Sequence, residues 1–173
     1  MIGKKFLKRN LDVEVYRRAA DWCNVNGAMA MIEDKGEYYE VVAAPESSVE
    51  EVKAAKLLEI KDWTAAAITG GFVSAGVRYD SDIDTQITMQ GICLAVNTPR
   101  FAEEYPNGAP VRGYDKGAAE KTVHWLDADG ILLFCQDLSA HIGYCKMIGW
   151  KLQQAVAEAK TVDDLQAIKW PED

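Results

Sequence analysis

The chain has 173 residues and a net charge of −8, from 19 basic and 27 acidic side chains. This length fits one domain with an appendage and excludes a large architecture such as an eight-fold barrel. Apolar residues make up 49% of the sequence. Such a chain can bury roughly two thirds of its unfolded surface, which excludes a disordered or collagen-like protein.

Hydropathy and charge narrow the expected partners. The apolar stretches fall far below the roughly 20 residues that cross a bilayer, so we expect no membrane partner. The basic start lacks the apolar core of a signal peptide, so we do not expect secretion by this route. The acidic surplus argues against nucleic acid, because phosphate contacts need a surplus of lysine and arginine. Other proteins are the expected partners.

The first 18 residues are basic in an otherwise acidic chain. Six basic residues against two acidic residues give this segment a charge of +4 and leave −12 on the remainder. The plain interpretation is a solvated positive face on a terminal helix. The sharper interpretation is a basic arm that docks on the acidic body of a neighbouring copy or of another assembly component, since opposite fields steer association. A short nucleic-acid contact is the third interpretation. Its candidate residues are Lys4, Lys5, Lys8 and Arg9.

The N-terminal part predicts a helix followed by a β-hairpin. Residues 11–23 carry apolar side chains at helical spacing. Residues 28–33 and 37–43 are rich in β-formers, and the Asp34–Gly36 connection supplies a glycine for the turn. We therefore predict an N-terminal unit over residues 1–46.

A second helix, a short hairpin and a third helix are predicted next. Ser47 and Glu50 form a capping-box signature that starts a helix running to about Thr69. Residues 72–79 indicate a short bent strand or hairpin around Ala75 and Gly76. Asp80, Ser81 or Asp82 can cap the helix predicted over 83–97. Its apolar residues surround most of its circumference, which predicts a well-buried element.

The second half predicts a long loop, another hairpin and a long helix. Residues 98–117 hold three prolines and three glycines and are interpreted as a loop. Residues 122–126 and 131–135 flank an Asp-Gly turn and predict a hairpin. Asp137 then caps the longest helix, which runs to about Lys160, and Thr161 with Asp164 starts a short closing helix.

The long helix carries a heptad seam. Its apolar and small residues recur at alternating steps of four and three: Leu138, Ile142, Cys145, Gly149, Leu152, Val156 and Ala159. This spacing predicts close packing on another helix, with Gly149 letting the partner backbone approach. Trp150 lies beside the seam and is the better interface candidate among the tryptophans, whereas Trp63 and Trp125 are expected to anchor the core. The interface candidates are Ile142, Gly149, Trp150 and Leu152.

Together these elements predict an α+β fold. It has several helices packed with two or three short antiparallel hairpins and a long C-terminal helix. The predicted domains are the N-terminal unit at 1–46 and an α+β domain at 47–173 that contains the long loop at 98–117.

Catalytic and metal-binding motifs are sparse. The four cysteines are irregularly spaced, so neither a disulfide framework nor a zinc ribbon is expected. Cys135, His141 and Cys145 place two soft ligands and an imidazole close in sequence, which keeps a zinc- or thiol-dependent enzyme open as the alternative. We predict no catalytic residue, no cofactor and a non-enzymatic protein.

Residues 48–170 resemble a family found in tailed phages and prophages, the domain of unknown function 4376. The resemblance rests on the order and spacing of several short groups: Glu59–Lys61, Gly76–Asp82, Gln86, Ile87, Gly91, His124, Trp125, Asp129, Gly130, Asp137, Ala159, Thr161, Leu165 and Ile168. Proteins of this kind are described as tail, tail-fibre or tail-assembly associated. The resemblance implies no catalytic residues.

The resemblance and the seam together favour one function. We expect a phage or prophage tail component or tail-assembly factor that self-associates or binds other tail proteins. Its expected location is the virion or the host bacterial cytoplasm. A ligand-binding domain that uses the Tyr38 and Tyr39 face of the first hairpin is the third possibility.

Overall fold

The computed structural model describes residues 1–26, 29–44 and 47–171, and it divides the chain into two compact units, Met1–Ser48 and Val49–Asp173. Each unit combines helices with one small antiparallel sheet, so the predicted α+β class is confirmed. Within the described residues, every helix is too short or too polar to span a membrane.

The first unit is a three-stranded sheet with one packed helix. Its elements are β1 (Lys5–Leu7), a 3-10 helix (Lys8–Asn10), α1 (Val13–Val25), β2 (Ala30–Asp34) and β3 (Tyr38–Ala43). The predicted helix and hairpin are confirmed, although residue 28, where the hairpin was expected to begin, lies outside the described residues. The antiparallel strand order is β1-β3-β2, and Gly36 makes the turn at a φ of 83°. The basic N-terminal segment therefore forms a strand and a turn ahead of α1.

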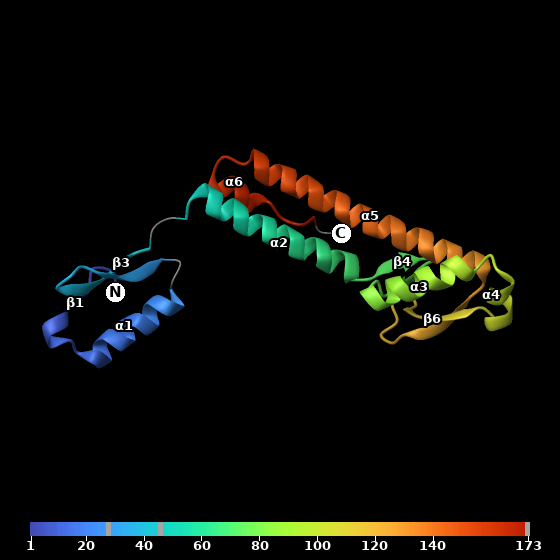
Figure 1. Cartoon of the computed structure of the whole chain (residues 1–173), viewed down its shortest axis with the longest axis horizontal. Coiled ribbons are helices and arrows are strands. Elements are labelled where there is room, and N and C mark those ends of the chain that lie inside the picture. Colours follow the sequence, from blue (N-terminus) through green and yellow to red (C-terminus); the bar gives the residue numbers. More distant parts are fainter. Residues whose placement is uncertain (27–28, 45–46, 172–173) are drawn as a thin grey trace. The chain divides into compact units, whose positions relative to one another are not determined.

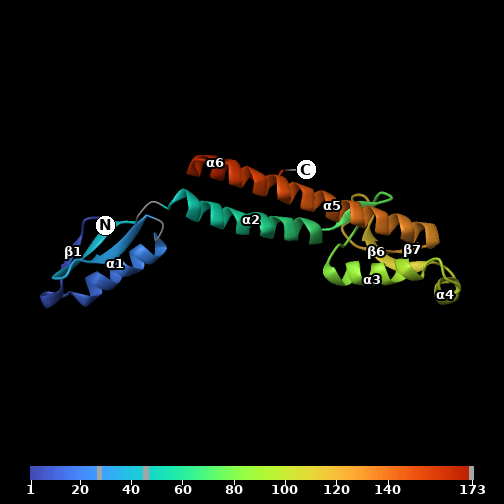
Figure 2. The same cartoon turned by 45° about the horizontal axis from the view of Figure 1, so that its top comes forward.

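The second unit sets a four-stranded sheet against a long helix pair. Its elements are α2 (Val49–Thr69), β4 (Phe72–Ser74), β5 (Val77–Tyr79), α3 (Ile83–Ala95), α4 (Pro99–Glu104), β6 (Ala109–Tyr114), β7 (Thr122–Leu126), α5 (Ala128–Glu158) and α6 (Val162–Ala167). The antiparallel strand order is β4-β5-β6-β7. Figures 1 and 2 show α2 and α5 side by side in opposite directions, with the sheet beside the N-terminal part of α5.

Local sequence signals explain several boundaries. Ala75 and Gly76 both have positive φ, at 48° and 82°, which makes the tight turn between β4 and β5. Asp82 caps α3 by accepting a hydrogen bond from the Thr85 N–H at 2.9 Å. Thr161 and Asp164 form a full capping box at α6. These three predictions are confirmed.

The predicted loop at 98–117 is wrong, because this range contains α4 and β6. Pro99 stands at the start of α4, where its missing N–H breaks no helical hydrogen bond. β5 pairs with β6 only at Gly113 and Tyr114. Pro110 therefore has a partner strand on one side only, which is the edge position where proline is tolerated.

The second predicted hairpin is also wrong. β7 forms at 122–126 as expected, but residues 131–135 belong to α5, which begins at Ala128 instead of after Asp137. Asp127 is the cap, and its carboxylate accepts a hydrogen bond from the Gly130 N–H at 2.8 Å. Ile131 and Phe134 are both fully buried, at the spacing of one helix face.

The prediction that α3 is buried around its circumference is wrong as well. Met89 is its one buried residue. Ile83, Ile87 and Leu94 are exposed. The helix packs one face on the sheet and α5 and leaves the opposite face apolar and uncovered.

Two cores hold the second unit together. One joins the inner side of the sheet to α3, α4 and the N-terminal half of α5. The other joins α2, α6 and the C-terminal half of α5 around Ile60, Val156 and Leu165. In the first core, Phe134 makes edge contacts with Phe72 and Tyr79, each at 4.9 Å between ring centroids. Burial raises the pKa of the Tyr79 phenol.

We expect Phe134→Ala to lower the free energy of unfolding of the second unit by about 3–5 kcal/mol, because it removes a fully buried ring between two others. Urea unfolding of the full chain measures this change. Leu133→Ala on the exposed side of the same helix is the control, with an expected loss under about 1 kcal/mol. Equal losses for the two variants would contradict the assignment of the core.

Candidate association surface

The heptad seam of α5 packs mainly within its own chain. Leu138 lies in the sheet-side core, and Val156 lies in the core shared with α2 and α6. Cys145 and Gly149 are buried between these two ends. The predicted helix partner is therefore α2 of the same unit.

The two helices approach each other closely at Gly149. A Cβ atom at this position would lie 2.5 Å from Thr64 Oγ1, a distance that real Cβ contacts do not reach. The Thr64 hydroxyl is held in place because it donates a hydrogen bond to the Ile60 carbonyl at 2.7 Å. The predicted close approach is thus present, and it stabilises the fold of a single chain.

A shallow groove runs between α2 and α5 beside this contact. We call it the hairpin groove; it is lined by Lys61, Thr64, Ala65, Ile68, Lys146, Gly149, Trp150 and Gln153. Two lysines and no carboxylate line it, although the chain as a whole is acidic. Trp150 lies at the edge of this groove and is 65% exposed. The predicted interface residues Gly149 and Trp150 therefore meet at one surface.

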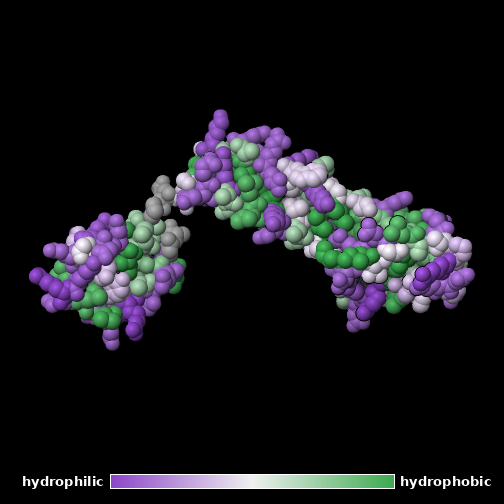
Figure 3. Space-filling model, in the orientation of Figure 1, coloured by the Kyte–Doolittle hydropathy of each residue, from purple (hydrophilic) through white to green (hydrophobic). Residues whose placement is uncertain are grey.

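The outer faces of the helix pair expose several large apolar side chains. Ile60 is the only buried residue of the 21 in α2. Leu58 is 64% exposed, and Leu57 is exposed as well. On α5, no acidic residue occurs between Asp137 and Glu158, and Tyr144 and Met147 are exposed. Figure 3 shows hydrophobic residues, in green, reaching the surface along α2 and the neighbouring elements.

The other two predicted interface residues belong to the cores. Ile142 is half-buried against the sheet-side core and also lines a groove between α3 and α5. Leu152 is half-buried against the core of α2, α5 and α6. Both side chains are less exposed than that of Trp150 and are therefore less available for contact with another chain.

The predicted docking lysines already have partners within the first unit. Lys8 Nζ lies 2.7 Å from Asp34 Oδ1, and Lys5 Nζ lies 3.8 Å from Glu40 Oε1. The hydrogen bond between Lys8 and Asp34 raises the pKa of the lysine and lowers that of the carboxyl. Lys4 lies over the Phe6 ring at 5.5 Å. The unit as a whole, with seven basic and eight acidic residues, carries −1, so much of the basic character is balanced locally.

The cysteine and histidine candidates do not gather into one site. His141 Nε2 lies 3.1 Å from the Ala67 carbonyl, so it donates a hydrogen bond that ties α5 to the last turn of α2. Cys145 Sγ lies 3.8 Å from that imidazole. Cys135 instead donates to the Met89 carbonyl on α3, at 3.6 Å. Over residues 1–26, 29–44 and 47–171, no three acidic, histidine or cysteine side chains are arranged to hold a metal.

Cys135 is poorly suited to nucleophilic attack. Burial, with a hydrogen bond to Cys93 as the second cause, raises the pKa of its thiol to about 12. The thiolate is the reactive form, and this environment suppresses it at neutral pH.

The sequence reasoning missed one exposed face. Trp125 was expected in the core, but it is 62% exposed on β7, whereas Trp63 is half-buried as expected. Arg112 lies diagonal to it on β6, within the predicted loop 98–117. Alternation along the correctly predicted strand at 122–126 could have placed Trp125 outward, whereas Arg112 required β6 to be identified as a strand.

Comparison with known proteins identifies one family. A family model described as a domain of unknown function, DUF4376, matches residues 51–169, and this description names no activity. No curated protein and no solved structure matches the chain.

We expect Gly149→Leu to destabilise the second unit by about 1–3 kcal/mol, because the new side chain overlaps Thr64 and forces the helices apart. Thermal or urea unfolding checks this. Gly143→Leu on the same helix is the matched control, since a Cβ there meets no atom within 4 Å. It should be neutral or slightly stabilising, as leucine favours helix more than glycine does. Equal destabilisation by both variants would contradict the close contact.

We expect Cys135 to resist alkylation by iodoacetamide at pH 8. Its pKa of about 12 leaves almost no thiolate in the folded chain. Unfolding restores an ordinary thiol, so alkylation in urea should be at least about a hundredfold faster. Peptide mass spectrometry follows this residue directly. Comparable rates in the folded and unfolded chain would refute the protected thiol.

Proposed function

The chain belongs to the DUF4376 family over residues 51–169, and we propose that it is a non-enzymatic phage or prophage structural protein. In this proposal it is a tail component or a tail-assembly factor that acts by protein–protein association. Self-association is the first mode of binding, and other tail proteins are further partners. The virion or the host bacterial cytoplasm is its proposed location.

The single observation that carries association is the uncovered helix pair. A surface helix normally turns its large apolar side chains toward the core, yet α2 has one buried residue and exposes Leu57 and Leu58. Trp150 projects from the same pair at the edge of the hairpin groove. Large apolar side chains grouped on a surface mark interaction sites, and tryptophan commonly dominates interface energies.

A second copy suits this surface in shape and in charge. Two antiparallel helix pairs that pack face to face form a four-helix arrangement, which covers the apolar residues of both. The hairpin groove presents Lys61 and Lys146. The exposed side of α2 also carries Asp62, which gives each copy an acidic group for the lysines of the other, whereas Glu59 is paired with Lys56 of its own helix.

The tail assignment rests on the family resemblance and on the chemistry of the surface. Tail proteins work by forming repeated contacts with copies of themselves and with other subunits, and the open helix pair suits such contacts. Burial raises the pKa of the Cys135 thiol, and a protonated thiol at this position gives nucleophilic chemistry by Cys135 no support.

Light scattering of the full chain over a concentration series tests self-association. We expect a reversible oligomer that Leu58→Lys and Trp150→Lys each weaken at least tenfold, because each places a charge in the apolar contact. Leu94→Lys is the control, since it changes an exposed leucine on α3 and should leave the oligomer unchanged.

A chain that remains monomeric up to roughly 100 µM, the scale of a weak interface, would refute self-association. The tail role has a separate measurement: mass spectrometry of purified particles and of tail-assembly intermediates. Absence of the chain from both would refute the role in tails and leave self-association standing.

A further inference from the structure

The sheet of the second unit has one covered face and one open face. Its inner side chains, which include Phe72, Tyr79 and Ala109, enter the core beneath α3 and α5. Cross-strand partners point to the same side, so the strand register defines the opposite set. We call it the outer sheet face; its residues are Val73, Arg78, Pro110, Arg112, Tyr114, Val123 and Trp125.

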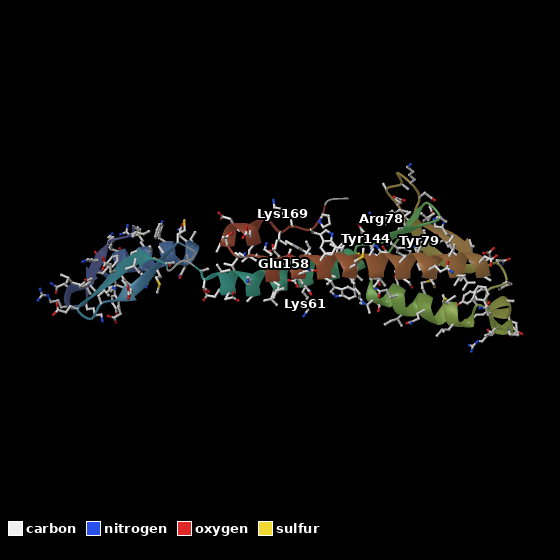
Figure 4. The ribbon with its side chains drawn as sticks, turned by 90° about the horizontal axis from the view of Figure 1, so that it is seen from above. Lys61, Arg78, Tyr79, Tyr144, Glu158 and Lys169 are labelled. Atoms are coloured by element: carbon white, nitrogen blue, oxygen red, sulfur yellow. The ribbon has the colours of Figure 1, made fainter. Side chains whose placement is uncertain are left out.

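Basic and aromatic side chains alternate across this face. Arg78 stands opposite Tyr114, and Arg112 stands opposite Val123 and diagonal to Trp125. Both arginines are exposed, and the indole of Trp125 is largely open to solvent. Arg78 donates to the Gly70 carbonyl at 3.0 Å, which holds its guanidinium over the edge of the sheet. Figure 4 shows Arg78 at the sheet end of the unit, away from Lys61 on α2 and Lys169 in the segment after α6.

A further basic residue, Lys121, lies beside the outer sheet face. Lys121 lies between β6 and β7, with Nζ 5.2 Å from the centre of the Tyr114 ring. It also binds Asp80, which neutralises the acidic group that follows β5. Hydrogen bonding to Asp80 raises the pKa of Lys121, while the charge of nearby Arg112 lowers it. Two cations are therefore held close together at one side of the face.

One end of the outer sheet face is hollowed. The hollow, about 710 Å³, is lined by Val73, Gly76, Arg78, Tyr114, Asp115, Lys116, Gly117 and Ala118. Its single carboxylate, Asp115, is engaged elsewhere: Thr122 Oγ1 donates to Oδ2 at 2.9 Å, and Oδ1 lies 3.7 Å from His124 Nε2. The hollow therefore holds two cations, Arg78 and Lys116, against the one carboxylate of Asp115, with the Tyr114 ring in its wall.

We propose that the outer sheet face binds single-stranded nucleic acid. The phosphates contact Arg78, Arg112 and Lys116, and a base stacks on Trp125, the exposed ring of the face. An open sheet that pairs cations with exposed aromatic rings is the arrangement that such strands use, because each base offers a ring face and each nucleotide a negative charge. The net charge of −8 disfavours binding over the whole surface, and it confines binding to this basic region. This site lies outside the hairpin groove and does not depend on the proposed function.

Fluorescence anisotropy with a fluorescein-labelled oligothymidylate and the full chain tests the proposal at low and at moderate salt. Arg112→Glu should weaken binding about tenfold and reduce the slope of log affinity against log salt by about 0.7, the value for one lost phosphate contact on a single strand. Trp125→Ala should weaken binding about tenfold with an unchanged salt slope, because it removes a stacking partner and no charge. Both residues are exposed, so neither variant disturbs the core.

Lys169→Glu is the matched charge control, because it makes the same change in net charge on the C-terminal segment. It should leave affinity unchanged. Absence of binding by the unaltered chain at low salt would overturn the proposal. Equal weakening by Lys169→Glu would overturn it too, because binding would then follow overall charge. Full competition by polyglutamate, with no effect of Trp125→Ala, would indicate an acidic protein partner and would also refute it.

Discussion

The close packing of α2 on α5 is the contact on which the second unit depends. The two cores of this unit lie toward opposite ends of α5, and only the helix pair connects them. The absence of a side chain at Gly149 lets Thr64 approach, and His141 ties the neighbouring turn to the Ala67 carbonyl. The fold and the proposed association surface therefore follow from the same pairing.

Structural features that depend on residues close together in the chain could be predicted from the sequence. The caps at Asp82 and Thr161 and the turn at Gly76 depend on side chains next to the backbone that they satisfy or shape. The errors arose where two local signals compete. Residues 131–135 are a short apolar run that suits a strand or a buried helix equally, and the preceding Asp-Gly pair fits a turn as well as a helix start. Burial against the sheet, which is a tertiary effect, favours the helix.

The candidate site was predictable in part. The seam showed that Gly149 would contact a helix, but sequence spacing does not tell whether that helix belongs to the same chain. The basic N-terminal segment was recognisable, yet its pairing with Asp34 and Glu40 depends on strand β1, which no pattern indicated. The outer sheet face could not be predicted, because β6 contains a proline and a glycine and its sequence is typical of a loop. Long-range pairing creates such surfaces, and short windows of sequence do not contain it.

The unbroken length of α5 has a mechanical consequence. A helix of 31 residues rises about 46 Å, and it runs without a break from the end that holds the sheet to the end that holds α6. Helical hydrogen bonds resist stretching, so the helix acts as a strut that keeps its two ends at a constant spacing. In an array of copies joined through both ends of this helix, the length of the helix would set the distance between neighbouring contacts.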